Sequence, residues 1–163
     1  MSEVPRTLPG MNLLPLAARH EVGIALPRHW PTRTDPDRGV VVEARSPVVP
    51  PGGFVPTLVL RAGPGAGTLP DGAETEDEDA FDLDGRWWVE YLRFAHRVSG
   101  CEVVGERWTW HLDDSRVTLT GSVARVDYED YCDLFEDVAA TVDITPGVNA
   151  SARGSAPRDG GRW

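Results

Sequence analysis

The side chains that could carry out chemistry are scattered along this chain. The histidines are His20, His29, His96 and His111, and none stands at the short spacing from a second His or Cys that structural zinc sites use. Cys132 falls on the apolar stripe of a predicted helix, where a buried structural thiol is the expected role. Acidic residues are so numerous that no pair stands out for acid–base catalysis. We therefore expect no catalytic residue, no metal site and no cofactor.

Two short motifs resemble ligand-binding loops but lack the residues that would complete them. The segment Gly63–Thr68 has Thr68 where a dinucleotide-binding loop needs its third glycine, and the chain contains no lysine for a phosphate-binding P-loop. The segment Asp82–Gly85 looks like half of a calcium loop. The first EF-hand ligand would however fall on Ala80, and the bidentate acid on Tyr91. We interpret the first motif as a flexible turn and reject the second as a specific calcium site.

The charge of the chain excludes several classes of partner. Its 163 residues include 26 Asp and Glu against 16 basic residues, all of them Arg, for a net charge of −10. Nucleic acid is not an expected partner, because phosphate contacts dominate such binding. No segment approaches the roughly 20 apolar residues of a membrane span, and no secretory signal is recognisable at the N-terminus. We expect a cytoplasmic protein without a membrane partner, in which Cys101 and Cys132 are reduced.

The domain organisation follows from composition. We expect a flexible N-terminal segment over residues 1–18, a single α+β domain over 19–144, and a disordered tail rich in Gly, Ala, Ser and Pro over 145–163. Eight carboxylates lie between Asp71 and Asp84, which predicts a solvated loop or the start of a short helix.

The central part of the chain reads as an antiparallel sheet of about six strands. A turn is expected over Pro31–Arg38, and tight turns at Ser99-Gly100 and Asp113-Asp114 favour hairpins. An amphipathic helix follows, with Asp127 as its N-cap. We expect this helix on one sheet face, with a second helix or loop layer as an option on the other. The predicted strands are Glu21–Leu26, Gly39–Arg45, Phe54–Ala62, Trp87–Val98, Cys101–Leu112 and Ser115–Val126.

Two-residue turns fix which residues of the three last strands lie opposite each other, and this pairing separates two faces. One face is mainly apolar, includes Trp108 and Trp110, and pairs Arg93 with Glu106 as a predicted ion pair. The other face mixes aromatic and polar side chains. Two interpretations account for this mixed face. It is covered by the N-terminal segment or by the 71–85 loop, or it is exposed as a binding groove. The candidate binding residues on this face are Trp88, Leu92, Phe94, Arg107, His111 and Arg116.

Several segments then resemble a known family. They are the strand segments EVGIALPRHW, GVVVEARSP and FVPTLVLRAG, the meander segments, and the closing helical segment DYEDYCDLFEDVAATVDI. Their pattern resembles the PsbP-like fold and, within it, the actinobacterial LpqN/LpqT group. The likeness spans residues 20–144, with the Leu26–Trp30 turn among its closest matches. It implies an antiparallel sheet with helices on one or both faces and a protein-binding, non-enzymatic role. Members of the group are typically exported or lipidated, and neither signal is recognisable in this sequence.

We predict a cytosolic adaptor or chaperone-like helper that binds a protein partner, associated with a bacterial secretion system. The oligomeric state is left open. An alternative is a carrier of a small apolar ligand between sheet and helix, which a large cavity beside Trp108, Trp110 and Tyr131 would favour. An enzyme is a third hypothesis, which only a deep pocket holding two or more convergent titratable groups would support.

Overall fold

The computed structural model of the chain describes residues 14–16, 20–64, 66–113 and 115–146. Its α-helix is α1, Tyr128–Ala140, which is preceded by the 3-10 turn η3, Arg125–Asp127. Another 3-10 turn, η2, spans Pro36–Arg38. The strands are β1 Leu14–Leu16, β2 His20–Gly23, β3 Thr32–Asp35, β4 Val40–Arg45, β5 Thr57–Ala62, β6 Glu74–Leu83, β7 Trp87–Val98, β8 Cys101–His111, β9 Arg116–Ala124 and β10 Asp143–Pro146.

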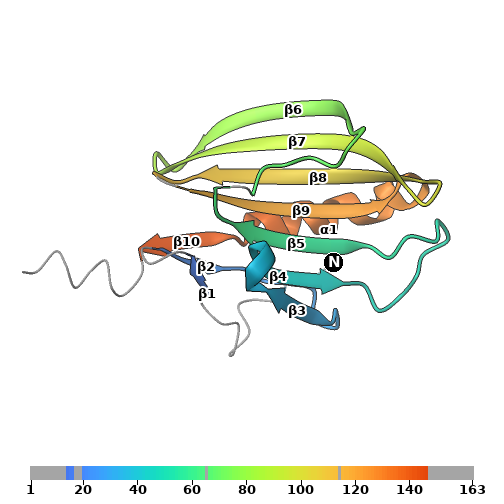
Figure 1. Cartoon of the computed structure of the whole chain (residues 1–163), viewed down its shortest axis with the longest axis horizontal. Coiled ribbons are helices and arrows are strands. Elements are labelled where there is room, and N and C mark those ends of the chain that lie inside the picture. The colour runs from blue at the N-terminus through green and yellow to red at the C-terminus, as the bar shows by residue number, and fades with distance from the viewer. Residues whose placement is uncertain (1–13, 17–19, 65, 114, 147–163) are drawn as a thin grey trace, which may run out of the picture.

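The strands form one large and one small antiparallel sheet. The large sheet has seven strands in the order β3-β4-β5-β9-β8-β7-β6, and the small one has three in the order β1-β2-β10. Helix α1 lies across one face of the large sheet and contacts β8 and β9 (Figure 1). The predicted α+β class with a C-terminal helix on one face is confirmed, with one more strand in the main sheet than expected and a second sheet besides.

The predicted meander and its register are confirmed. Trp88 lies opposite His111, and Trp110 lies opposite Val117, as the two short turns require. Ser99 and Gly100 both have positive φ, at 49° and 81°, which is the backbone of the hairpin turn whose twist matches that of the flanking strands. Local turn chemistry was therefore sufficient to fix the register of these strands.

The acidic segment expected to be a loop or a short helix is instead strand β6, at one edge of the large sheet. Its backbone pairs with β7, and all of its side chains but that of Leu83 are exposed. Charge on an edge strand costs little and discourages pairing with another chain. A run of acidic residues is therefore compatible with an edge strand. The same correction applies at the opposite edge, where β3 lies inside the segment predicted as a turn.

Both terminal predictions need adjustment where the structure describes the chain. Strand β1 lies within the segment expected to be flexible, and β10 extends two residues beyond the expected domain end. Both strands pair with β2. The other parts of the predicted flexible segment and tail fall outside the described residues.

The core lies between helix α1 and the apolar face of the large sheet. Phe135 is fully buried, and its ring lies over Gly121, where an added Cβ would stand 2.6 Å from ring atoms. Asp127 stands at the N-cap position, but its carboxylate accepts a hydrogen bond from Gly52 N, at 3.0 Å, and makes no cap hydrogen bond. The expected capping role is therefore wrong: the side chain ties the loop after β4 to the start of the helix.

Candidate functional site

A cavity of about 450 Å³ lies between helix α1 and strands β6, β7 and β8. This volume falls in the range of small-molecule sites. Phe81, on the outer wall, is 40% exposed, so the cavity opens toward the edge strand. Its lining is mostly apolar: Phe81, Leu83, Val89, Trp108, Trp110, Ala139, Ala140 and Val142, with Asp79, Tyr91, Glu106 and Glu136 as the polar members.

The space exists because of how the elements are placed and which residues they carry. Strand alternation puts Phe81, Tyr91 and Trp108 on the same sheet face as the helix. Helix α1 contacts β8 and β9, whereas β6 and β7 extend past it toward the edge of the sheet (Figure 1). The helix presents the small residues Ala139 and Ala140 to the cavity, so that its own side chains do not fill it.

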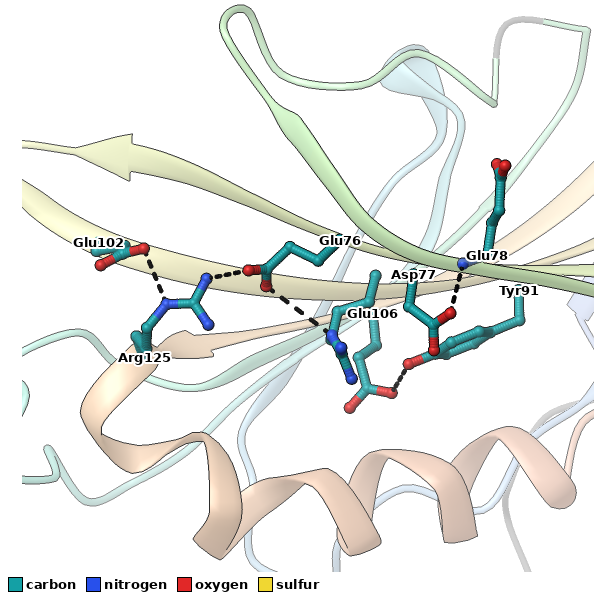
Figure 2. A network of polar contacts seen from close by, with 8 residues as sticks. Glu76, Asp77, Glu78, Tyr91, Glu102, Glu106 and Arg125 are labelled. Carbon is teal, nitrogen blue, oxygen red and sulfur yellow. Dashed lines mark hydrogen bonds and ion pairs between the residues drawn. The ribbon is translucent and has the colours of Figure 1, made fainter.

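One buried carboxyl group lies in this otherwise apolar lining. Glu106 is 5% exposed, and the Tyr91 hydroxyl donates a hydrogen bond of 2.6 Å to its Oε2. Oε1 has no hydrogen-bond partner. Figure 2 shows the Glu106 side chain extending from the sheet toward the helix, with Tyr91 beside it.

Burial governs the electrostatics of this pair. Loss of solvent raises the pKa of Glu106, an effect that hydrogen bonding with Tyr91 and Tyr128 and the nearby Arg93 partly offset. Burial, together with the neighbouring Glu106 carboxylate, raises the pKa of Tyr91 well above its ordinary range. Tyr91 therefore keeps its proton and acts as the donor, which leaves Oε1 of Glu106 as the free acceptor.

The predicted Arg93–Glu106 ion pair is replaced by another contact. Arg93 does lie opposite Glu106 in the register, but its ion pair is with Glu76, at 3.9 Å. The pairing of β6 with β7 shifts between Thr75 and Asp77, and such an irregularity re-aims the intervening side chain. Glu76 also binds Arg125 at 2.6 Å, and Arg125 binds Glu102 at 2.8 Å, so this network ties the edge strand to η3 (Figure 2).

The six residues predicted to form a binding groove on the other sheet face do not share one environment. Phe94 is 1% exposed and Arg107 is 9% exposed, so neither is available at the surface. The guanidinium of Arg107 lies over the Phe94 ring, 5.5 Å from its centroid, and donates to the carbonyls of Gly67 and Thr68, each at 3.1 Å. Their role is to hold the glycine-rich loop on the sheet.

This loop covers part of the face. The 71–85 segment, which the sequence suggested as cover, forms strand β6 at the sheet edge, and most of the N-terminal segment lies outside the described residues. Trp88, at 51% exposure, and the exposed Arg116 stay open, on either side of the half-buried His111 in one row of the sheet. Leu92 is half-buried. The structure thus leaves an exposed corner at Trp88 and Arg116 and, on the same face, a pocket of about 380 Å³ whose lining includes Phe94 and Arg107.

The cavity residues were missed for identifiable reasons. Asp79, Phe81 and Leu83 lie in the segment read as a loop. Glu106 was assigned to an ion pair, although Gly121 lies opposite it on β9 and has no side chain to cover it. A carboxyl group on an apolar face, flanked by glycine, is the signal that could have identified the site.

Two further searches cover the described residues only. No group of three or more His, Cys, Asp or Glu is placed to hold a metal ion. No helix there has the length and apolar character needed to cross a membrane.

Comparison with known proteins identifies the fold. No protein-family model matches the chain, and no curated protein matches it either. Among solved structures, LpqN of Mycobacterium tuberculosis, described as involved in cell envelope biogenesis, superposes with a TM-score of 0.61 at 14% identity, over 78% of this chain and 84% of that one.

Two other structures are similar over a comparable share of the chain. The cyanobacterial PsbP of Synechocystis sp. PCC 6803 has a TM-score of 0.53 at 16% identity, over 79% of this chain and 94% of that one. PA94 of Pseudomonas aeruginosa, described as a putative regulator of unknown function, has a TM-score of 0.54 at 10% identity, over 78% and 91%. The chain has a PsbP-like fold that is similar in structure to LpqN, as the sequence segments indicated.

Proposed function

We propose that this chain binds a small, mostly apolar molecule in the cavity between α1 and the β6–β8 part of the sheet. The observation that carries the proposal is a cavity of about 450 Å³, lined mainly by apolar and aromatic side chains and holding one buried carboxyl group with a free oxygen. Sites of this kind obtain affinity from apolar burial and orientation from a few polar groups.

Binding without chemical conversion is part of the proposal. Titratable groups do converge on the cavity, which is the condition set above for an enzyme. The one hydroxyl among the lining residues belongs to Tyr91, whose raised pKa makes it a poor base or nucleophile. The lining includes no thiol and no imidazole. Glu106 is better suited to hold a ligand than to act alone on one.

The test is a titration with 1-decanol, followed by the fluorescence of Trp108 and Trp110, which line the cavity. Ala140 is exposed on the helix and borders the cavity, so Ala140→Phe should fill its opening without disturbing the core. Ala80→Phe is the matched control, on the exposed edge strand outside this cavity. We expect saturable binding that A140F weakens at least about tenfold and A80F leaves unchanged. No saturable binding, or equal binding by both variants, would refute the proposal.

A second candidate function is the protein binding predicted from the sequence, now confined to the exposed corner. The observation that favours it is Trp88, a large aromatic side chain at 51% exposure, in one row with Arg116. Tryptophan and arginine are enriched at the centres of protein interfaces. In this function the chain is a cytoplasmic adaptor or chaperone-like helper linked to a secretion system. Its test is affinity capture with wild type, Trp88→Ser and Arg116→Glu; a partner set that is identical for all three would exclude this surface.

A further inference from the structure

The charged side chains that line the cavity all carry the same sign. They are Asp79 on β6, Glu106 on β8 and Glu136 on α1, and the lining includes no arginine. We propose that the cavity is selective for a hydrophobic ammonium compound, an apolar chain or ring that carries one cationic nitrogen, with that nitrogen bound by Glu106. This inference rests on the proposed function and specifies its ligand class.

The free oxygen of Glu106 is what distinguishes this site from a surface cluster of acids. A buried polar atom without a partner is costly, and a carboxylate oxygen is most costly of all. Tyr91 donates to Oε2, and Tyr128 on α1 also interacts with the carboxyl group, but Oε1 itself has no hydrogen-bond partner among the described residues. An ammonium group supplies both the hydrogen bond and the compensating charge.

The neighbours of Glu106 leave room for that charge. From β7, Tyr91 donates to it, and Arg93 lies nearby but pairs with Glu76. From α1, Tyr128, Cys132 and Glu136 face it, and β9 contributes only Gly121. Arg93 is the one cationic group in this set. Glu136 adds a further negative charge on the helix side, where it borders the cavity.

The aromatic walls suit a cation as well as an apolar body. Tyr91 and Trp108 lie with ring centroids 5.4 Å apart at 52°, and Trp110 follows along the same strand. Faces of tyrosine and tryptophan attract cations, most strongly where water is excluded. An anionic amphiphile would meet carboxylates in place of a counter-charge, and a neutral one would lose the ionic contribution.

The experiment compares three probes of one shape and different charge: decylammonium, 1-decanol and decanoate. Each is titrated below its aggregation concentration, at neutral pH and in about 0.3 M salt, which screens charges more than about 10 Å apart and so suppresses adsorption to the acidic surface. Binding is followed by calorimetry and by the tryptophan fluorescence of the folded chain. The variants are Glu106→Gln and, as a control that removes one exposed charge from the same helix, Glu129→Gln.

We expect decylammonium to bind the wild type at least about tenfold more tightly than decanol, and decanoate to bind most weakly. E106Q should remove the preference for the cation and keep decanol binding, and E129Q should change neither. Equal affinity for decylammonium and decanol in the wild type would overturn the inference, whether or not E106Q folds. A preference that survives in E106Q would overturn it too. Decanol binding without a cation preference leaves the proposed function standing, whereas no binding of any probe rejects both.

Discussion

A methyl group added at Gly121 should destabilise the domain by forcing apart the helix and the sheet. Gly121 lies in the middle of β9, where a Cβ would stand 2.6 Å from two atoms of the Phe135 ring and 2.9 Å from a third. Contacts between carbon atoms are comfortable at about 3.5–4.0 Å, so the ring must retreat by roughly 1 Å. Phe135 is fully buried, with 0% of its surface accessible. Overpacking of such a site costs about 1–3 kcal/mol.

Urea unfolding followed by tryptophan fluorescence measures this change directly, since Trp108 and Trp110 lie in the same core. We expect Gly121→Ala to lower the free energy of unfolding by about 1–3 kcal/mol at an unchanged dependence on urea. Phe135→Leu alone should cost about 1–2 kcal/mol through lost burial. In the double variant the smaller side chain makes space for the new methyl group. The double variant should therefore lose about 1 kcal/mol less free energy of unfolding than the sum of the losses in the two single variants.

The reasoning is refuted if G121A unfolds within about 0.5 kcal/mol of the wild type. It is also refuted if the costs of the two substitutions are simply additive, because a steric origin requires coupling. The result bears on the cavity as well. Gly121 lies opposite Glu106, so the ring that covers Gly121 closes the core beside the buried carboxyl group.

Three further predictions address buried charge and the exposed corner. Because burial raises the folded-state pKa of Glu106, protonation favours the folded state; the stabilisation is present at low pH and is lost as the pH rises through the folded pKa. The unfolding free energy of the wild type relative to E106Q should thus increase as the pH falls from neutral toward the ordinary carboxyl pKa, and a pH-independent difference would contradict this sign. Arg107→Leu should cost about 1–2 kcal/mol in urea unfolding, since it removes the hydrogen bonds that hold the glycine-rich loop on the sheet, whereas the exposed Arg116→Leu should change stability by under about 0.5 kcal/mol. Trp88→Ser should likewise leave the unfolding midpoint nearly unchanged, and a large loss would show that Trp88 is a packing residue.

What could be predicted from the sequence was the part governed by local rules. The turn at Ser99-Gly100 and the alternation of side chains determine the register of β7, β8 and β9, and both are readable along the chain. The edge strand β6 could not be read this way, because its carboxylates face solvent and its only strand signal is the backbone pairing with β7. Edge strands are held by their neighbours more than by their own side chains.

The candidate site was less predictable than the fold because it depends on space. The faces of the meander were separated correctly, and a cavity does lie beside Trp108 and Trp110 as the carrier hypothesis required, although Tyr131 is not part of its lining. The space left on each face depends on a distant segment: the glycine-rich loop packs beside Arg107 on one face, and the alanines of α1 leave room beside Glu106 on the other. The sequence of the glycine-rich loop does not indicate that it packs beside Arg107, and the sequence of α1 does not indicate that its alanines lie near Glu106.

Glu106 and Arg107 show how a buried charge that serves the fold differs from one that is available for binding. They are neighbours on β8, so they point to opposite faces of the same sheet, and both are more than nine-tenths buried. Arg107 has partners for Nε and Nη1 among Thr120, Gly67 and Thr68, so its burial is compensated within the chain. Glu106 borders a cavity, and of its two oxygens Oε2 accepts a hydrogen bond from Tyr91 whereas Oε1 has no hydrogen-bond partner among the described residues. A ligand that completes an incomplete hydrogen-bond set recovers part of its cost, and for this reason our proposed ligand site is built on Glu106 and not on the exposed aromatic corner.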